Sequence, residues 1–406
     1  MTTSILRAAS ALTASLAALA LPAAALAETA AMQGSSQQIA SGPSKQDEFA
    51  RFTPRPTGAK MSLDYGFWDD ALKFFVMSMG PSTRQGERKP DASLGTRLTY
   101  GHDSRTRLEG NRVVFSFLKD DQITPLSEYR ADLEQIASEI DIASLSRNEQ
   151  LAFWINLHNV AVTEMIGLNY PLKAPSRMKL GPDRTPLDET RFINVAGVMM
   201  SPRDIRTRIV YPNWKDPMVI YGFFRGDIGG PSIRKSAYTG ANVGEQLAYS
   251  ANEFVNSLRG VEAWGGSLLV SRIYEEAAPY YFPNFETDLK AHLAAHAEEE
   301  VTRLLATNDK VKYNEYEIDI ADLAGGQREP SYGFVQRDGE FDGTRVTPSI
   351  ARLLGERSEK FEKLRREGKL GRVIVLPENF GSSDQPLPEG TVTVLPPEAE
   401  ADPEID

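Results

Sequence analysis

One stretch limits the possible folds more than any other: residues 148–171 form a helical pattern that is apolar on almost every side. Apolar residues recur at the spacing of one helical face, and others fill much of the opposite face. Ser146 followed by Glu149 predicts a capping box at the start, and Pro171 predicts the stop. A helix of this kind is normally buried, so we expect the remaining elements to pack around it.

Three polar residues, Asn156, His158 and Asn159, interrupt this apolar helix and need hydrogen-bond partners once they are buried. His158 has a functional interpretation as a general base or a substrate-positioning donor whose pKa is tuned by burial. The alternative is a core histidine that bonds the backbone or the asparagines. We take His158 as the candidate catalytic residue, and Asn156 and Asn159 as candidate ligand-binding residues.

Composition excludes several classes of chemistry. The chain has 406 residues and no cysteine, which rules out disulfides, thiolate metal sites and a cysteine nucleophile. Its formal net charge of −11 argues against nucleic acid as a partner and against adhesion to an anionic membrane surface.

The first residues have the pattern of a secretory signal. Arg7 precedes an apolar run over residues 8–21, and the small residues before Glu28 predict cleavage after Ala27. No later stretch approaches the length of a membrane span. We expect a periplasmic or secreted protein that does not insert into a membrane after the signal is removed.

The rest of the chain divides by pattern. We predict a disordered lead-in over residues 28–60, a helical and loop extension over 61–140, a core over 141–285, a C-terminal extension over 286–376 and a disordered acidic tail over 377–406. Helices and short strands mix without a regular βαβ alternation, which indicates the α+β class, with a helix-rich core and a small, mainly antiparallel sheet.

Finer patterns predict individual elements. Helices are expected over residues 61–79, from Pro125 onward, after a capping box of Asn242 and Glu245, over 286–306 as a charged surface helix, and over 348–366. Hairpins are expected at 191–200 and 261–273, strands at 113–118 and 218–224, and edge strands at 316–320 and 372–376.

Several motifs then follow in a fixed order between residues 142 and 283: LAFWINLHNVAV, MSPRDIR, IGGPS, AYTG and VSRIYEEAAPYYF. In this order they resemble the domain-of-unknown-function 547 (DUF547) family, and the flanking stretches resemble a bacterial exported subgroup. The resemblance implies an α+β core similar to papain-like and transglutaminase-like folds. It implies no particular reaction.

The chain departs from that family at one loop. Many members carry a histidine at the end of a strand, a cysteine after it and a second cysteine before a proline. Here Ile220, Arg225 and Gly230 stand at those positions. The subgroup pattern therefore lacks the family's cysteine and histidine, and a thiol–imidazole nucleophile cannot be assembled here.

The same loop, RGDIGGPS, offers a different chemistry. Its backbone N–H groups and Arg225 suit an anionic ligand, so Arg225, Gly229 and Gly230 are candidate ligand-binding residues. The alternative is a tight turn in which glycines satisfy the backbone.

An arginine-rich stretch, residues 101–112, provides two more candidates. Arg105 and Arg107 suit recognition of a carboxylate because a guanidinium binds a carboxylate with two parallel hydrogen bonds. The alternative is an internal network of ion pairs and turns that fixes the N-terminal arm to the core. His102 lies in the same stretch.

His292 and His296 are one helical turn apart, a spacing that can hold zinc, but Leu293 stands where the metalloprotease signature has glutamate. We expect no metal and no cofactor.

These observations leave three hypotheses. The first is a non-catalytic binding or scaffolding domain whose groove accepts a peptide, a cell-wall ligand or a protein partner. The second is a hydrolase or transferase that uses His158 with a carboxylate, or with His102, on peptide or cell-wall material. The third is a metal-dependent enzyme. Whether the protein is an enzyme stays open, and the missing cysteine favours a binding role.

Overall fold

The computed structural model describes residues 47–58, 61–90, 101–118, 120–327 and 347–370. Four predictions concern residues outside these ranges: the signal peptide, the lead-in up to residue 46, the strand at 372–376 and the tail from 377.

The described residues combine helices with short strands, as predicted for the α+β class. The α-helices are α1 (Gly66–Phe75), α2 (Asp120–Glu139), α3 (Arg147–Leu168), α4 (Pro202–Asp204), α5 (Tyr211–Asn213), α6 (Val243–Val255), α7 (Ile273–Tyr281), α8 (Phe285–His296), α9 (Glu299–Thr307) and α10 (Pro348–Arg366). Single turns of 3₁₀-helix are η1 (Glu48–Phe52), η2 (Phe115–Phe117), η3 (Ile142–Ser144), η4 (Pro175–Arg177), η5 (Leu187–Glu189) and η7 (Pro217–Gly222), and η6 (Ile205–Val210) is a π-helical turn.

The strands form small sheets. They are β1 (Val76–Ser78), β2 (Asn111–Val113), β3 (Lys179–Leu180), β4 (Thr185–Pro186), β5 (Ile193–Val195), β6 (Val198–Met200), β7 (Val261–Trp264), β8 (Ser267–Val270) and β9 (Lys310–Tyr313). Strands β1–β2, β3–β4, β5–β6 and β7–β8 pair antiparallel, and β9 joins β8 in parallel.

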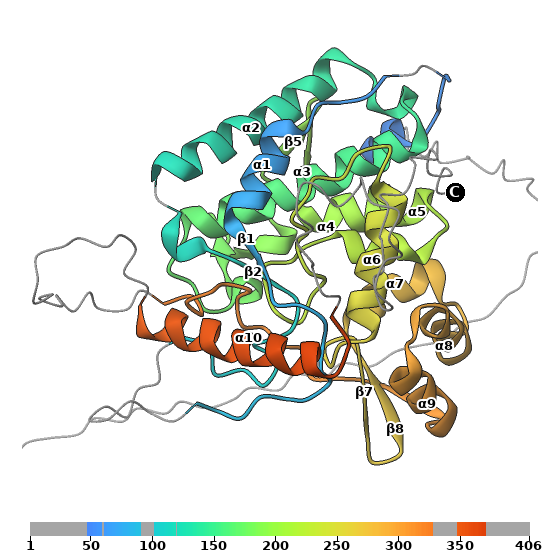
Figure 1. The fold of residues 1–406 in the computed structure, drawn as a ribbon. Helices are drawn as coiled ribbons and strands as arrows, with labels where there is room; N and C mark the ends of the chain where they lie inside the picture. Colours follow the sequence, from blue (N-terminus) through green and yellow to red (C-terminus); the bar gives the residue numbers. More distant parts are fainter. Residues whose placement is uncertain (1–46, 59–60, 91–100, 119, 328–346, 371–406) are drawn as a thin grey trace, which may run out of the picture. The chain divides into compact units, whose positions relative to one another are not determined.

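Helix α3 is the buried centre that the sequence predicts, with α2 and α6 packed against it (Figure 1). Ser146 caps it by accepting a hydrogen bond from the Glu149 N–H at 3.2 Å. The Glu149 carboxylate, however, accepts from the backbone N–H groups of Leu63 and Gly240 at 2.9 and 3.1 Å. Only half of the predicted capping box therefore forms, and the other half ties two distant segments to the start of α3.

A second, smaller core lies under α10. Ile350 and Leu353 of α10 pack with Met79, Leu108 and Leu323, which come from three other parts of the chain. The extensions on either side of the central region therefore pack against one another.

The predicted lead-in over residues 28–60 is wrong for residues 47–52. There the chain forms η1, and Phe49 and Phe52 are buried in the main core. Apolar side chains at this spacing gain enough from burial to order a short segment.

The predicted buried strand at 218–224 is also wrong. Residues 217–222 form η7, and the Asp216 carboxylate accepts a hydrogen bond from the Met218 N–H at 2.9 Å at its start. Proline at the first helical position, directly after an aspartate, is a start signal for a helix. The apolar run shows that the segment is buried, but it does not distinguish a strand from a helix.

Other predictions need smaller corrections. Helix α2 begins at Asp120, so Pro125 lies inside it. The charged helix expected at 286–306 is two helices, α8 and α9, and Leu289 and Leu293 of α8 are fully buried. Asn242 precedes α6 but makes no side-chain capping bond.

Two predicted strands are wrong, whereas two predicted hairpins and one predicted helix are confirmed. The expected strand at 113–118 is only β2 followed by η2, and residues 316–320 form no strand beyond an isolated bridge between Asp227 and Ile320. Both predicted hairpins and the helix over 348–366 are confirmed. Among the described residues, no helix combines the length and the apolar character needed to cross a membrane.

We predict that Gly260→Ala destabilises the protein by about 2 kcal/mol or more. A methyl group at this position would lie 2.0 Å from the Phe254 carbonyl oxygen, a backbone atom that cannot move alone. Chemical denaturation measures the change.

Gly355→Ala is the matched control, because this helical glycine has no atom within 4 Å of the added methyl group. It should leave stability unchanged or raise it by up to about 1 kcal/mol. Equal effects of the two substitutions would contradict the tight turn at Gly260.

Candidate functional site

His158 is fully buried on α3, and both of its ring nitrogens are bonded. Its Nδ1–H donates to Asn159 Oδ1 at 3.0 Å, and its Nε2 accepts from Arg206 Nη1 at 2.9 Å. Burial lowers the pKa of His158 to about 3, and the Arg206 charge adds to the effect. A buried, neutral ring with both nitrogens bonded is typical of a structural histidine. This environment argues against the predicted role of His158 as a general base.

The two asparagines of α3 hold backbone. Asn156 donates to the Tyr238 carbonyl at 2.7 Å and accepts from the Tyr238 N–H at 3.1 Å. Asn159 donates to the Gly222 carbonyl at 2.9 Å and accepts from the Phe224 N–H at 3.0 Å. Each side-chain amide thus bonds a backbone N–H and a backbone C=O, as a neighbouring strand would. Both amides are therefore occupied within the chain.

Arg206, which the sequence analysis missed, is the centre of an ion network next to His158. Its guanidinium is fully buried and binds two carboxylates: Asp188 at 2.7 and 2.8 Å, and Glu276 at 2.8 and 3.0 Å. The residue is the last of the MSPRDIR motif, and its place in a motif of the resemblance was the available signal.

Arg225 extends this network. Its Nη2 lies 2.7 Å from Glu276 Oε1, so one glutamate bridges two arginines. Burial alone raises the pKa of Glu276, but the charges of Arg206 and Arg225 outweigh burial and hold it well below the usual value. Arg225 is therefore occupied by a carboxylate of its own chain.

The glycine loop, residues 225–232, is contacted by residues 316–320, which lie outside the central region. Gly229 N–H donates to the Glu317 carbonyl at 2.8 Å, and a methyl group on Gly229 would meet that oxygen at 2.6 Å. Inside the loop, Asp227 Oδ1 accepts from the Tyr316 hydroxyl at 2.7 Å and from the Gly230 N–H at 3.2 Å. Gly229 is thus required by the close approach of residues 316–320.

A pocket of 450 Å³ opens beside this loop. Gly229 and Arg105, two of the predicted ligand-binding residues, both line it. Its other lining residues are Thr106, Arg177, Leu258, Arg259, Ser271, Asn314, Glu315, Tyr316, Glu317 and Ile318. The pocket is therefore polar and rich in arginine, although the chain as a whole is acidic.

The arginines of the pocket differ in what they already bind. Arg105 holds Glu262 with two hydrogen bonds at 2.7 and 2.9 Å. Arg177, at the end of η4, is exposed, and its guanidinium makes no hydrogen bond or ion pair with a described residue, although its charge acts to lower the pKa of the nearby Asp319, which burial raises. Sequence reasoning missed Arg177 because nothing near it in the sequence marks a site.

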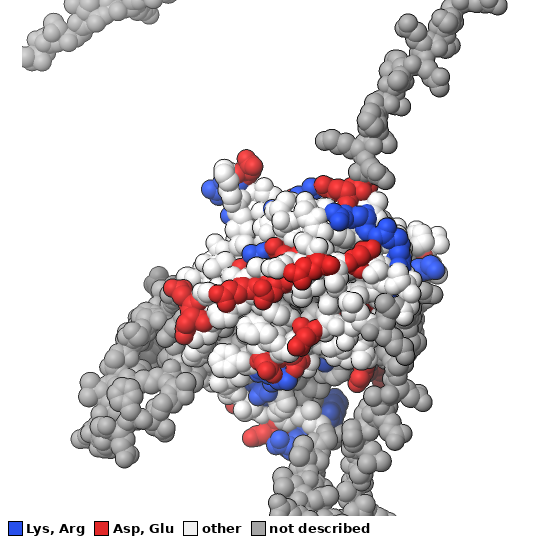
Figure 2. Space-filling model, turned by 90° about the horizontal axis from the view of Figure 1, so that it is seen from above, with Lys and Arg blue, Asp and Glu red and all other residues white. Residues whose placement is uncertain are grey.

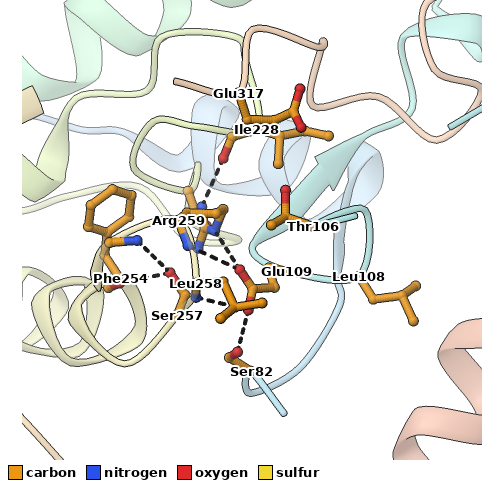
Figure 3. Close-up of polar contacts among 12 residues, drawn as sticks. Ser82, Thr106, Leu108, Glu109, Ile228, Phe254, Ser257, Leu258, Arg259 and Glu317 are labelled. Atoms are coloured by element: carbon orange, nitrogen blue, oxygen red, sulfur yellow. Dashed lines mark hydrogen bonds and ion pairs between the residues drawn. The ribbon is translucent and has the colours of Figure 1, made fainter. Parts of the chain in front are cut away.

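A buried polar cluster around Arg259 (Figure 3) forms part of the pocket's wall, since Leu258 and Arg259 line the pocket. Arg259 donates to the carbonyls of Ile228 and Gly230 at 3.3 and 2.9 Å and lies 3.8 Å from the Glu109 carboxylate. Glu109 in turn accepts from Ser82 and from the backbone N–H groups of Leu258 and Arg259. This wall joins four separate segments of the chain and holds the glycine loop in place.

The rest of the arginine-rich stretch is a structural network. Arg107 is buried and binds Glu356 of α10 at 2.7 and 3.0 Å. Arg112 donates to the backbone carbonyls of Thr106, Arg107, Glu109 and Asn111. These contacts match the alternative of an internal network, and they leave Arg107 no place in a ligand site.

Two of the other histidines, His102 and His292, are also hydrogen-bonded through their rings. His102 Nε2 bonds the Asp322 carbonyl, and burial, followed by the charge of Arg112, lowers its pKa to about 3. His292 Nε2 bonds the Tyr221 hydroxyl at 2.8 Å. Within the described residues, no group of three or more His, Asp or Glu side chains is placed to hold a metal ion.

The fold and the site define an α+β protein with a buried ion network and an arginine-lined pocket at the edge of its central region. Residues 142–255 match the model of a family described as "Protein of unknown function, DUF547". Comparisons with curated proteins and with solved structures gave no match.

We predict that Arg206→Met costs on the order of 3 to 5 kcal/mol of stability, because it removes a fully buried guanidinium from the carboxylates of Glu276 and Asp188, whose side chains are 14% and 39% exposed. The matched control is Arg203→Met, whose arginine pairs with Glu189 on the surface with side chains about half exposed (51% and 50%). That change should cost less than about 1 kcal/mol. Similar losses in denaturation experiments would show that the Arg206 network is not a buried one.

We also predict a pH-dependent effect of Asp227→Asn. Burial raises the pKa of Asp227 to about 7, from an ordinary value of 3.8. The unfolded chain therefore releases this proton at lower pH than the folded chain, and the carboxyl lowers stability progressively from pH 4 to pH 7.

Asparagine keeps an acceptor oxygen for Tyr316 but has no proton to lose. The stability of the Asp227→Asn variant relative to the natural chain should rise between pH 4 and pH 7 by on the order of 3 kcal/mol. Denaturation curves at several pH values measure this, and parallel stability profiles would contradict a raised pKa.

Proposed function

We propose that the protein is an exported, non-catalytic binding domain that holds a peptide through its carboxylate in the pocket beside Gly229. The observation that carries the proposal is the pocket itself, which brings Gly229 and Arg105 together with the open guanidinium of Arg177. The family resemblance implies a papain-like core, and here that core has Arg225 and Gly230 at the family's cysteine positions.

The lining chemistry fits a peptide. The exposed guanidinium of Arg177 makes no hydrogen bond or ion pair with a described residue and suits a carboxylate, because a guanidinium forms two charge-assisted hydrogen bonds with it. Asn314 and Thr106 supply groups that bond peptide amides, and the exposed Glu315 suits an amine. Peptides from cell-wall material carry all three groups and are the natural ligand class in an exported compartment.

The alternative, a hydrolase or transferase that depends on His158, has less support. His158 is buried, bonded at both nitrogens and separated from solvent by the Arg206 network. The chain has no cysteine to act as nucleophile. A binding role requires neither an unbonded His158 nitrogen nor a cysteine.

The test uses two pools of random hexapeptides, one with free C-terminal carboxylates and one with C-terminal amides. The full-length protein should retain members of the free-acid pool in preference to the amidated pool. Arg177→Glu should weaken the affinity for the retained peptides at least about tenfold, which corresponds to the loss of one charge-assisted hydrogen bond. Affinity selection followed by mass spectrometry measures both.

Lys179→Ala, an exposed cation close to Arg177 in the sequence but outside the pocket, is the control and should bind as the natural protein does. Equal retention of both pools, or no effect of Arg177→Glu, contradicts the proposed pocket. Cleaved or transferred peptides in the same mass spectra would instead establish an enzyme.

A further inference from the structure

The outward face of α1 is apolar although it is exposed. Phe67, Ala71 and Phe74 follow one another at helical spacing, and the two phenylalanines are 47% and 73% exposed. The inward face already supplies the core, with Trp68, Leu72 and Phe75 buried. Ala71 packs against the core and the Phe67 ring lies 5.1 Å from that of Tyr129 on α2, but most of the Phe74 side chain and about half of Phe67 remain exposed. Exposed apolar side chains that adjoin one another in this way mark interaction sites.

This face borders a pocket that is apolar in its lining. A cavity of 340 Å³ lies between α1 and the first turns of α2, with Phe67 and Phe74 on one side and Pro125 on the other. The buried side chains of Phe75 and Leu126 also line it. A cavity of this size accepts one or two large apolar side chains of a partner.

The rim and the adjoining helix are acidic. Along α2, Asp121, Glu128, Asp132 and Glu139 recur at positions i, i+7, i+11 and i+18, which places them in one line on the helix surface. All four are exposed, and none has a cation within 4 Å among the residues that the structure describes. Figure 2 shows a row of acidic side chains on the face seen from above, where α2 is uppermost in Figure 1.

The only basic residue of α2 does not neutralise this row. Arg130 lies on the opposite side of the helix and is held by Glu134 and Glu164. The acidic row therefore presents carboxylates without ion-pair partners among the described residues next to the apolar pocket, and Asp121 lies on the pocket's rim. Asp70 also lies on the rim, but it pairs with Lys73 at 3.3 Å.

We propose that the pocket between α1 and α2 docks a cationic amphipathic helix of a partner protein. Apolar side chains of that helix fill the pocket around Phe67 and Phe74, and its lysines or arginines face the carboxylate row of α2. A second copy of this chain is the weaker occupant, because it would bring the same carboxylates and a net charge of −11 to the contact.

The test uses the full-length protein and a fluorescein-labelled helical peptide of leucine and lysine, with leucines at the spacing of one face. Fluorescence anisotropy should show saturable binding that weakens as salt concentration rises. Phe74→Ser and Asp121→Lys should each weaken binding at least about tenfold. A peptide with glutamate in place of lysine should not bind.

Two matched control variants distinguish specific binding at this surface from nonspecific binding of the peptide elsewhere. Trp264→Ser removes another exposed aromatic side chain (78% exposed) at the β7–β8 turn, and Glu359→Lys reverses an exposed charge on α10. Both should bind the peptide as the natural protein does. Because Phe74 and Asp121 are exposed, all four variants should keep the thermal stability of the natural chain.

Three results overturn the proposal. The leucine–lysine peptide fails to bind, or Phe74→Ser and Asp121→Lys weaken binding no more than the controls do. Alternatively, sedimentation shows a dimer of the natural chain that Phe74→Ser dissociates, in which case the occupant is a second copy.

Discussion

The rest of the structure depends on the polar side chains buried in α3. A fully buried amide costs free energy unless all its groups are bonded, and Asn156 and Asn159 meet this requirement by pairing with the backbone at Tyr238, Gly222 and Phe224. These bonds fix two distant segments against the central helix. The position of the glycine loop follows from them, because Phe224 directly precedes Arg225.

A second constraint is a continuous set of polar contacts that links the neutral His158 to Arg206, and Arg206 through Glu276 to Arg225. Every cation in it meets a carboxylate or a ring nitrogen, which is how a protein tolerates charge in its interior. The same bonds that satisfy the network occupy its members. Residues that look reactive in the sequence are therefore engaged in structural contacts, whereas the exposed guanidinium of Arg177 makes no hydrogen bond or ion pair with a described residue.

The pocket is completed by segments on both sides of the region that matches the family model, residues 142–255. Residues 317–323 run between β2 and the glycine loop: Val113 N–H donates to the Ala321 carbonyl at 2.8 Å, and Ala321 N–H donates to the Gly226 carbonyl at 2.9 Å. Arg105 comes from before this region and Tyr316 from after it. The pocket beside Gly229 and the exposed apolar face on α1 and α2 are thus features of these extensions as much as of the central region.

The sequence by itself determined the buried central helix, both hairpins and the helix over 348–366, because periodicity, turn glycines and caps are local signals. It also excluded cysteine chemistry. Tertiary structure alone decided that Glu149 bonds Leu63 and Gly240, and that Arg105 and Gly229 share a pocket with Arg177. Those outcomes depend on residues far apart in the chain, and burial and charge pairing between them leave no mark in any local pattern.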